Sequence, residues 1–509
     1  MGSEEFNLTD NMRNMRKAGT SLFTIFLLAI LMAFTDSTVK AQVVSGQANK
    51  QKVKNVIIAQ TPPLGYNSFD SYGINIYEEL AIKEIDAFIE KFAPHGYEYF
   101  VIDNGWFAYP ESKKMDGLLV PVKGKTIPAD VYCDENGIPK PATQYFPNGL
   151  KPMIVKLHAK GLKFGIHLMR GIPRVAVDRN LPIKGTKYTA KDIYTTFDDC
   201  TWCTFMHGVD MTKPGSQEYY NSVFKQFAEW GIDFVKVDNV TQFPAEIEGY
   251  IKAIAQCGRP MILSLSAGGT SNVKFLETYK KTNMVRTTPD IWDEQISIER
   301  SFASMRKWQG LEQPGFWPDL DMIPFGELCL LRRPDVQKEN QDKQAEEAVG
   351  RMHHWCKLTE TQKETFITQR AISASPIMIG GSMISMDDHS YKLLTSSEML
   401  ACVKNGVHGK LIYEENDIEL WSAPIANAER QGFQEYVYKE GWVAFFNRSS
   451  QEQTVELKNK FLNFMPKGTY NLKDIWGNQS VNNYNRGNKL SLVIKGNGVV
   501  FLKYTQVQP

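Results

Sequence analysis

Charged side chains whose types and spacing suit chemistry lie at the ends of several short apolar runs. In residues 231–239, Lys236 and Asp238 share one parity, so an extended chain projects both to the same side of a sheet. Taken alone, this stretch is compatible with a surface edge strand that carries a solvated ion pair. Several similar runs elsewhere in the chain favour a functional cluster instead.

The other charged residues of this kind lie in or directly after further apolar runs. One Asp after a strand is ordinary turn chemistry. Four runs that all deliver carboxylates to the same end of a parallel sheet would form a cluster with two cations beside it. The additional members of this predicted cluster are Asp103, Arg286, Asp290, Asp319 and Asp321.

A carboxylate cluster can do two kinds of chemistry. It can hold a hard cation such as Mg²⁺ for enolisation or phosphoryl transfer, or it can supply an acid and a nucleophile for cleavage of a glycosidic bond. The ammonium of Lys236 disfavours a metal at Asp238, because it competes with the ion. It is also expected to lower the pKa of the Asp238 carboxyl, as a nucleophile requires, whereas a general acid must stay protonated near the working pH.

Alternating strand and helix signals predict the scaffold that positions this cluster. Such a series implies a parallel sheet, and eight units indicate a closed (β/α)8 TIM barrel. An open doubly wound sheet is the alternative, although no Gly-rich phosphate motif follows the first strand. We expect strands within residues 61–69, 97–102, 163–169, 231–238, 261–265, 284–288, 315–323 and 376–379, and helices within residues 78–92, 150–159, 217–230, 245–255, 273–281, 294–308 and 361–374.

Two long excursions, residues 108–146 and 170–214, have no clear period and are expected to be functional loops. From about residue 417 the pattern changes to short alternating runs, which predict a C-terminal antiparallel β-sandwich. The expected strands of this part are residues 418–422, 434–438, 442–446, 454–457, 490–494 and 498–502. The predicted domains are residues 1–41 (export signal and possible non-native leader), 42–54 (linker), 55–412 (barrel) and 413–509 (β-sandwich).

The first forty residues resemble a cleaved export signal. Arg13, Arg16 and Lys17 precede the apolar run 22–34, and Ala41 is a small residue that a signal peptidase could accept. The apolar run is shorter than the roughly 20 residues that span a bilayer as a helix, so an uncleaved anchor is the weaker alternative. We therefore expect an exported protein, periplasmic or extracellular in a bacterium, with no stable membrane insertion after cleavage.

Composition narrows the range of partners. A formal net charge of +1 gives no electrostatic reason to expect binding to nucleic acid or to an acidic membrane, and favours a neutral polar substrate. The seven Cys residues are scattered and do not form a disulfide framework. The pair Cys200 and Cys203 lacks a second pair for a metal site, and a solvated helix end explains the pair His353 and His354. Oligomeric state is not predicted.

Six segments resemble, in order, the signatures of glycoside hydrolase family 27, the α-galactosidase or melibiase family. The resemblance extends from about residue 61 to the C-terminal sandwich. The segments are residues 61–69 (TPPLGYNSF), 99–106 (YFVIDNGW), 234–238 (FVKVD), 286–291 (RTTPDI), 316–322 (FWPDLDM) and 374–380 (ASPIMIG).

This resemblance implies a barrel with a C-terminal β-sandwich and a retaining double displacement without a metal or other cofactor. Carried over by position, Asp238 is the expected nucleophile and Asp290 the expected acid/base, with their carboxyl groups roughly 5 to 5.5 Å apart. It also implies that the substrate is a carbohydrate, with a terminal α-linked galactose as the expected group. The expected contacts to sugar hydroxyls are Asp103, Lys236, Arg286 and Asp321.

Departures from the family pattern leave the sugar open. Asn104 stands where a second acid is frequent, Phe69 where Trp is common and His167 where Tyr is common. Small residues from Ser266 to Gly269 replace bulkier groups near the 2-position of the sugar. Asn104 and Ser266 are thus further candidates for substrate binding, and α-N-acetylgalactosaminide or β-L-arabinopyranoside are alternative substrates. A non-catalytic carbohydrate-binding barrel is the alternative of another class, but it would have lost one of the two carboxylates.

Overall fold

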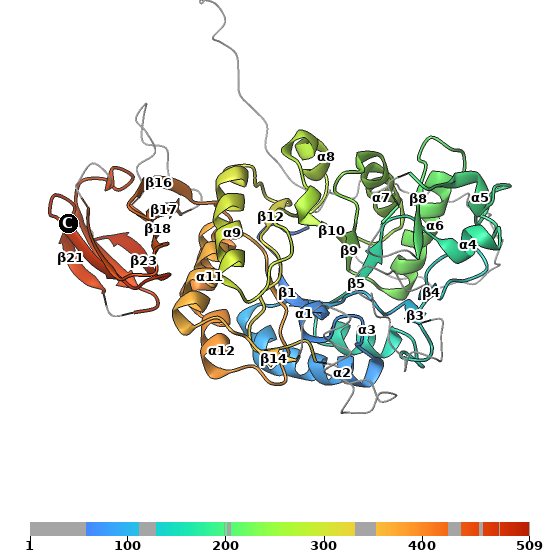
Figure 1. Ribbon diagram of the computed structural model, residues 1–509, viewed down its shortest axis with the longest axis horizontal. Helices are drawn as coiled ribbons and strands as arrows, with labels where there is room; N and C mark the ends of the chain where they lie inside the picture. The colour runs from blue at the N-terminus through green and yellow to red at the C-terminus, as the bar shows by residue number, and fades with distance from the viewer. Residues whose placement is uncertain are drawn as a thin grey trace, which may run out of the picture. The chain divides into compact units, whose positions relative to one another are not determined.

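Eight parallel strands form one sheet, with helices around it (Figure 1). The computed structural model describes residues 58–110, 129–197, 199–200, 205–330, 353–425, 439–457, 462–477 and 479–507. In hydrogen-bonded order the strands are β12 (Trp317–Asp319), β11 (Met284–Arg286), β10 (Ile262–Leu265), β9 (Phe234–Asp238), β5 (Lys163–Met169), β2 (Tyr99–Ile102), β1 (Leu64–Asn67) and β15 (Ile377–Ile379).

The two ends of this sheet are joined by the residues that follow β12. The Ile323 N–H donates to the Met378 carbonyl at 2.8 Å, and the Gly380 N–H donates to the Ile323 carbonyl at 2.9 Å. The sheet therefore curls into a barrel, which confirms the predicted fold class. β12 ends at Asp319, so the contact that closes the barrel against β15 is a short bridge formed by residues beyond the end of β12.

The helices lie outside the sheet (Figure 1), and each of the longer ones has buried apolar residues on one face. In α6 (Ser216–Trp230) the buried face includes Tyr220, Phe224 and Phe227, and Gly231 ends the helix with a positive φ of 93°. The chain then turns directly into β9. The other main helices are α2 (Glu78–Ala87), α3 (Lys151–His158), α7 (Pro244–Gln256), α8 (Leu276–Tyr279), α9 (Gln295–Trp308), α11 (Glu360–Ile372), α12 (Asp388–Leu394) and α13 (Ser397–Asn405).

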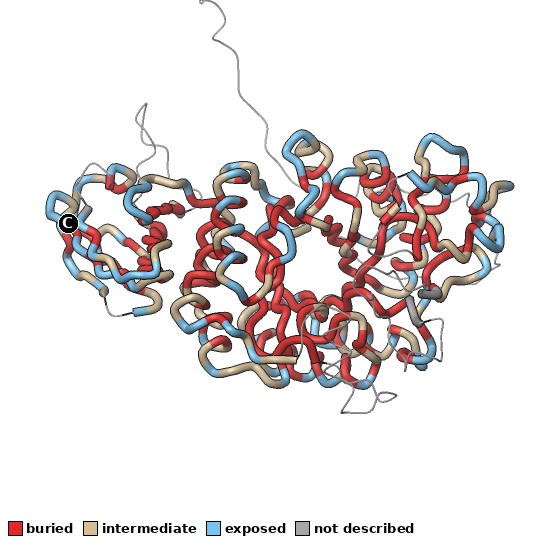
Figure 2. Tube along the Cα trace, in the orientation of Figure 1, coloured by how far each residue is buried: buried red, intermediate tan, exposed pale blue. Residues whose placement is uncertain are grey.

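Apolar side chains pack in the interior of the barrel. The barrel strands are buried along most of their length, as the red parts of the tube in Figure 2 show. Because side chains alternate along a strand, one parity of each strand faces this interior and the other faces the helices. The interior cluster is packed from different strands and consists of Tyr99, Val101, Phe234, Ile262, Met284, Met322 and Met378. A functional pocket is therefore expected where this packed layer ends, toward the carboxyl ends of the strands.

The two excursions carry more regular structure than their sequences indicate. Residues 170–214 include β6 (Ile172–Pro173), α4 (Arg174–Asp178), α5 (Ala190–Ile193), β7 (Tyr194–Thr195) and β8 (Met206–Val209), with the three strands in one small sheet. A capping box between Thr189 and Asp192 starts α5. In the other excursion, β3 (Ala108–Pro110) pairs with β4 (Ala129–Val131). The prediction of long loops therefore missed these short elements, because elements of two to five residues are too short to show a period; the functional role of the two excursions stays a prediction.

The interpretation of His353 and His354 as a solvated helix end was wrong. His354 lies in β14 (His354–Trp355), which pairs with β13 (Glu327–Leu328). His353 Nε2 lies 2.6 Å from Glu327, and His354 Nε2 lies 3.0 Å from the buried Asp293. Cys203 lies outside the described residues.

The C-terminal part contains two antiparallel sheets over a separate apolar core, which confirms the predicted sandwich. The predicted strand 434–438 lies outside the described residues, and the predicted boundary after residue 412 falls within β16. The larger sheet has the order β16 (Lys410–Glu415), β17 (Ile418–Pro424), β18 (Glu440–Asn447), β23 (Val499–Gln506), β20 (Thr469–Asp474) and β21 (Val481–Asn485). The smaller sheet pairs β19 (Gln453–Leu457) with β22 (Leu490–Ile494).

The predicted export signal and linker, residues 1–41 and 42–54, lie outside the described residues. Within the described part of the chain, every helix is too short or too polar to cross a bilayer.

Candidate active site

Lys236 links β9 to the end of β2 at the carboxyl end of the barrel. Its Nζ atom lies 2.8 Å from Asp103 Oδ2 and 3.8 Å from Asp238 Oδ2. Asn67, the last residue of β1, donates to the same Asp103 oxygen at 2.7 Å, and the Ser68 hydroxyl accepts the Asp103 N–H at 2.9 Å. The shared parity of Lys236 and Asp238 thus brings both to one face, as predicted. Asp103 is held by groups from β1 and β9.

Asp238 is buried between cationic and hydrogen-bonding neighbours. His167, from β5, places its Nε2 atom 3.3 Å from Asp238 Oδ2. Burial pushes the pKa of the Asp238 carboxyl upward, but Lys236, His167 and Arg286 outweigh burial and bring this pKa well below its usual range. Asp238 is therefore an ionised carboxylate at neutral pH, which is the state that a nucleophile needs.

The partners of Asp238 also remain charged. Burial alone would lower the pKa of Lys236, but Asp103 and Asp238 raise it above its ordinary value. Burial alone would likewise raise the pKa of Asp103, and Lys236 and His167 bring it below its ordinary value. These three groups therefore form a buried array of one cation between two carboxylates.

Arg286, at the end of β11, organises the second carboxylate. It donates from Nη2 to Asp290 Oδ1 at 2.6 Å, and its Nη1 atom lies 3.5 Å from Asp321 Oδ2. The Asp290 side chain is 73% exposed, whereas the Arg286 side chain is 9% exposed. Asp238 and Asp290 therefore occupy different environments, one enclosed and one exposed to solvent, which is the asymmetry expected of a nucleophile and an acid/base.

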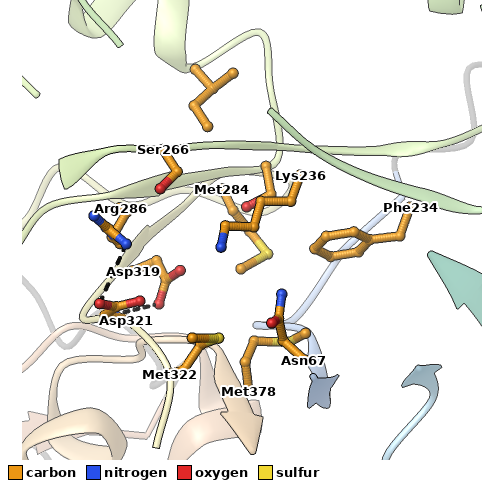
Figure 3. A pocket seen from close by; sticks show the side chains of 12 residues that line it. Asn67, Phe234, Lys236, Ser266, Met284, Arg286, Asp319, Asp321, Met322 and Met378 are labelled. Carbon is orange, nitrogen blue, oxygen red and sulfur yellow. Dashed lines mark hydrogen bonds and ion pairs between the residues drawn. The ribbon is translucent and has the colours of Figure 1, made fainter. Parts of the chain in front are cut away.

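A pocket opens beside these groups (Figure 3). Of the predicted site residues, Lys236, Ser266, Arg286 and Asp321 line it. Asp103 and Asp238 connect to the pocket through Lys236, and Asp290 connects to it through Arg286. The other lining residues are Asn67, Phe234, Ser264, Leu265, Met284, Asp319, Met322 and Met378.

Asn104 and Ser266, the two candidates taken from departures in the family pattern, differ in their placement. The Asn104 side chain is outside the pocket lining, and its Oδ1 accepts the Gly105 N–H at 2.9 Å. Ser266 lines the pocket, is 2% exposed, and its hydroxyl has no hydrogen-bond partner among the described residues. Because a buried hydroxyl is costly when unpaired, Ser266 is suited to bind a polar group of a ligand.

The loop that carries Ser266 is held between its neighbours. The Ser266 carbonyl accepts the Val240 N–H at 3.0 Å, and the Ala267 carbonyl accepts the Thr241 hydroxyl at 2.9 Å. On the other side, a Cβ atom added to Gly268 would lie 2.0 Å from the Thr288 carbonyl oxygen. This close backbone approach requires glycine at position 268 and ties the loop after β10 to the segment that carries Asp290.

Three polar residues that contact the charged groups of the site were absent from the predicted site: Asn67, His167 and Asp319. Asn67 and Asp319 line the pocket, whereas His167 contacts Asp238. Asn67 and His167 are polar residues near the ends of apolar strands, which is the signal that could have identified them. Asp319 was recognised as a strand-end carboxylate but was given no role. Among the described residues, no group of three or more His, Cys, Asp or Glu side chains is arranged to hold a metal ion.

Comparisons with known proteins agree with this geometry. The family model described as alpha galactosidase A matches residues 205–341, and that of the alpha galactosidase C-terminal β-sandwich domain matches residues 415–504. An α-galactosidase from Cyamopsis tetragonoloba is 24% identical over 431 residues, which cover 82% of this chain and 80% of the relative.

Solved structures give a closer match. A family 27 β-L-arabinopyranosidase from Geobacillus stearothermophilus, crystallised in complex with arabinose, is 32% identical with a TM-score of 0.77. The alignment covers 88% of this chain and 98% of that protein. The chain therefore belongs to glycoside hydrolase family 27, the α-galactosidase or melibiase family, and is an O-glycoside hydrolase that acts on a carbohydrate.

Proposed function

We propose that this enzyme removes terminal α-linked galactose from oligosaccharides or glycans by a retaining double displacement. Asp238 attacks the anomeric carbon and forms a glycosyl ester while Asp290 protonates the departing oxygen. Water then hydrolyses the ester, with Asp290 acting as the base. The observation that carries this proposal is the contrast between the enclosed, ionised Asp238 beside Lys236 and the exposed Asp290 beside Arg286, since both cations line the same pocket.

The charged groups around the pocket suit a neutral sugar rather than a charged one. Lys236 and Arg286 each have carboxylate partners, so their charge is already balanced before a substrate binds. Their remaining N–H groups and the oxygens of Asp103 and Asp321 can bind hydroxyls, which donate and accept at once. We propose these four residues, with Ser266, as the contacts to the sugar.

A second candidate substrate is a β-L-arabinopyranoside. This sugar has the ring stereochemistry of α-galactose without the hydroxymethyl group, so the same ring contacts serve both. The match to the Geobacillus stearothermophilus arabinopyranosidase, which is more similar to this chain than the Cyamopsis tetragonoloba α-galactosidase is, favours it. Asn104 in place of a second acid is compatible with either sugar, because its side chain lies outside the pocket lining.

A panel of nitrophenyl glycosides decides between these substrates. We expect the highest kcat/KM on the α-galactoside or the β-L-arabinopyranoside, and NMR of the first product should show retained anomeric configuration. The α-N-acetylgalactosaminide completes the panel, because Ser266 and Gly269 are small. Preference for that sugar would overturn the proposed specificity, and no turnover of any glycoside would favour the carbohydrate-binding alternative.

Two variants test the assigned roles. Asp238→Asn should fold and lose activity by several orders of magnitude, and trapping of the wild type with a fluorosugar should label Asp238. Asp290→Ala should lose far more activity on alkyl glycosides than on dinitrophenyl glycosides, which need no protonation to leave. A wild-type rate in Asp238→Asn, or equal losses on both substrates in Asp290→Ala, would refute the corresponding role.

A further inference from the structure

The segment that carries Asp290 is fixed from β12. We call residues 287–294, between β11 and α9, the acid/base loop. Asp321 contacts the residue after Asp290 and the residue before the loop: its Oδ2 accepts the Ile291 N–H at 3.0 Å, and the same oxygen lies 3.5 Å from Nη1 of Arg286, the last residue of β11. Arg286 in turn donates to Asp290 at 2.6 Å. The position of the exposed Asp290 carboxyl therefore depends on where Asp321 lies.

Asp321 takes a backbone conformation that needs support. Its φ is 73°, in the left-handed region, which a residue other than glycine adopts at a cost in free energy. The side chain of Asp319 supplies the support, because its Oδ1 accepts the Asp321 N–H at 2.9 Å (Figure 3). An Asp side chain commonly stabilises a left-handed residue in a turn by accepting the backbone N–H two residues later in the chain.

Asp319 also holds the start of the acid/base loop. Its main-chain carbonyl accepts the Thr287 N–H at 2.8 Å and the Thr287 hydroxyl at 3.0 Å. Ser304, from α9, donates to the Thr287 hydroxyl at 2.7 Å. The main chain of Asp319 thus fixes one end of the loop, and its side chain acts through Asp321 on the residue that follows Asp290.

We propose that Asp319 is a positioning residue for the acid/base step: its carboxyl oxygen holds Asp321 in the left-handed conformation from which Asp321 binds the loop of Asp290. This inference rests on the proposed role of Asp290. It gives a function to a pocket carboxyl that is 7% exposed and that neither attacks nor protonates the substrate. The required property is a hydrogen-bond acceptor at this position, not a charge.

The distinction between acceptor and charge defines the test. Asp319→Asn keeps an oxygen that accepts the Asp321 N–H, whereas Asp319→Ala and the nearly isosteric Asp319→Leu remove it. For each variant, kcat/KM is measured on a series of aryl and alkyl glycosides of the preferred sugar. Leu fills the space that Ala vacates, so the comparison survives if the Ala variant does not fold.

We expect Asp319→Ala and Asp319→Leu to lose about tenfold to 100-fold more activity on alkyl glycosides than on dinitrophenyl glycosides, because a displaced Asp290 protonates the leaving group poorly. Asp319→Asn should keep the wild-type dependence on the leaving group, whatever its overall rate. Equal losses across the series in Ala and Leu, or an Asn variant that behaves as they do, would overturn the inference.

Asp290→Ala, measured on the same glycosides, separates the acid role of Asp290 from the positioning role of Asp319. If Asp290→Ala shows no leaving-group dependence, the proposed acid role fails. If Asp290→Ala shows this dependence but the Asp319 variants without an acceptor do not, only the positioning role of Asp319 fails.

Discussion

The Lys236 ammonium lies 2.8 Å from Asp103. It lies 3.8 Å from Asp238, which has the same parity in β9. Lys236 is therefore closer to Asp103, which follows β2, than to the carboxylate of its own strand. The same oxygen of Asp238, Oδ2, lies near both the Lys236 ammonium and the His167 ring. Lys236 thus acts on the proposed nucleophile mainly through its charge, while its close contact fixes Asp103.

Removal of this charge should raise the pKa of Asp238. Because Asp238 must be ionised to attack, activity is lost as the pH falls through its pKa, and a higher pKa moves the acid limb of the kcat/KM profile to higher pH. We expect this shift in Lys236→Met. We also expect the free energy of unfolding to fall by about 3 to 5 kcal/mol, because two buried carboxylates lose their common cation.

A double variant is the control for the expected loss in the free energy of unfolding. In the double variant Lys236→Met/Asp103→Asn, a neutral side chain replaces each charge, so much of the lost stability should return. Denaturant unfolding of the four proteins in the cycle measures this coupling. Additive losses would show that Lys236 and Asp103 stabilise the fold independently.

His167 should affect the pH profile through its hydrogen bond to Asp238. In His167→Phe the bond is lost, so the pKa of Asp238 rises and the acid limb moves to higher pH. His167→Gln keeps a donor and should move the limb less. If both variants shift the limb equally, the effect comes from the charge or bulk of the imidazole and not from the hydrogen bond.

The Asp319 carboxyl should make the folded protein less stable as the pH rises. Burial and the nearby Asp321 raise its pKa from 3.8 to about 7, although the Asp321 N–H, Arg286 and Arg370 oppose the rise. Since the folded protein holds this proton more tightly than the unfolded chain, the contribution to stability is complete below about pH 4 and is lost as the pH rises through about 7.

The matching measurement is thermal unfolding of Asp319→Asn against wild type. The variant should gain stability relative to wild type as the pH rises from about 4 to about 8, because Asn has no proton to lose. Asp178→Asn, at an exposed position in α4, is the control and should show no such trend. A constant difference between Asp319→Asn and wild type would contradict the raised pKa.

The alternation of strands and helices was enough to predict the barrel and the existence of the C-terminal sandwich. Runs such as β5 carry apolar residues on both faces, and this pattern follows from burial between helices and barrel interior. Strands β16, β20 and β21 were not predicted. Most of β16 is partly or fully exposed, and β20 and β21 are rich in polar residues, so neither apolar runs nor their spacing mark these strands.

The site residues that could be predicted are charged residues whose type and position in an apolar strand already suggest a chemical role. Lys236, Asp238 and Arg286 are charged residues in apolar strands, and their parity or position placed them correctly at the strand ends. The partnership of Lys236 with Asp103 was not predictable, because it depends on the register between β9, β5 and β2. The support of Asp321 by Asp319 needed the backbone conformation of Asp321, which residue types do not reveal.

The contact between Gly268 and the acid/base loop gives the last prediction. Gly268→Ala would place a methyl group 2.0 Å from the Thr288 carbonyl oxygen, and both sides of this contact are backbone, so a segment must move. We expect a loss of about 1 to 3 kcal/mol in the free energy of unfolding. Because Thr288 lies two residues before Asp290, activity on alkyl glycosides should fall more than activity on dinitrophenyl glycosides.

The neighbouring glycine is the matched control for this substitution. A Cβ atom at Gly269 would have no atom within 4 Å, so Gly269→Ala should leave the free energy of unfolding within about 0.5 kcal/mol of wild type. If Gly268→Ala is as stable as Gly269→Ala, the backbone contact with Thr288 is looser than the structure indicates. If Gly268→Ala is destabilised but loses activity equally on all leaving groups, the loop after β10 supports the fold without positioning Asp290.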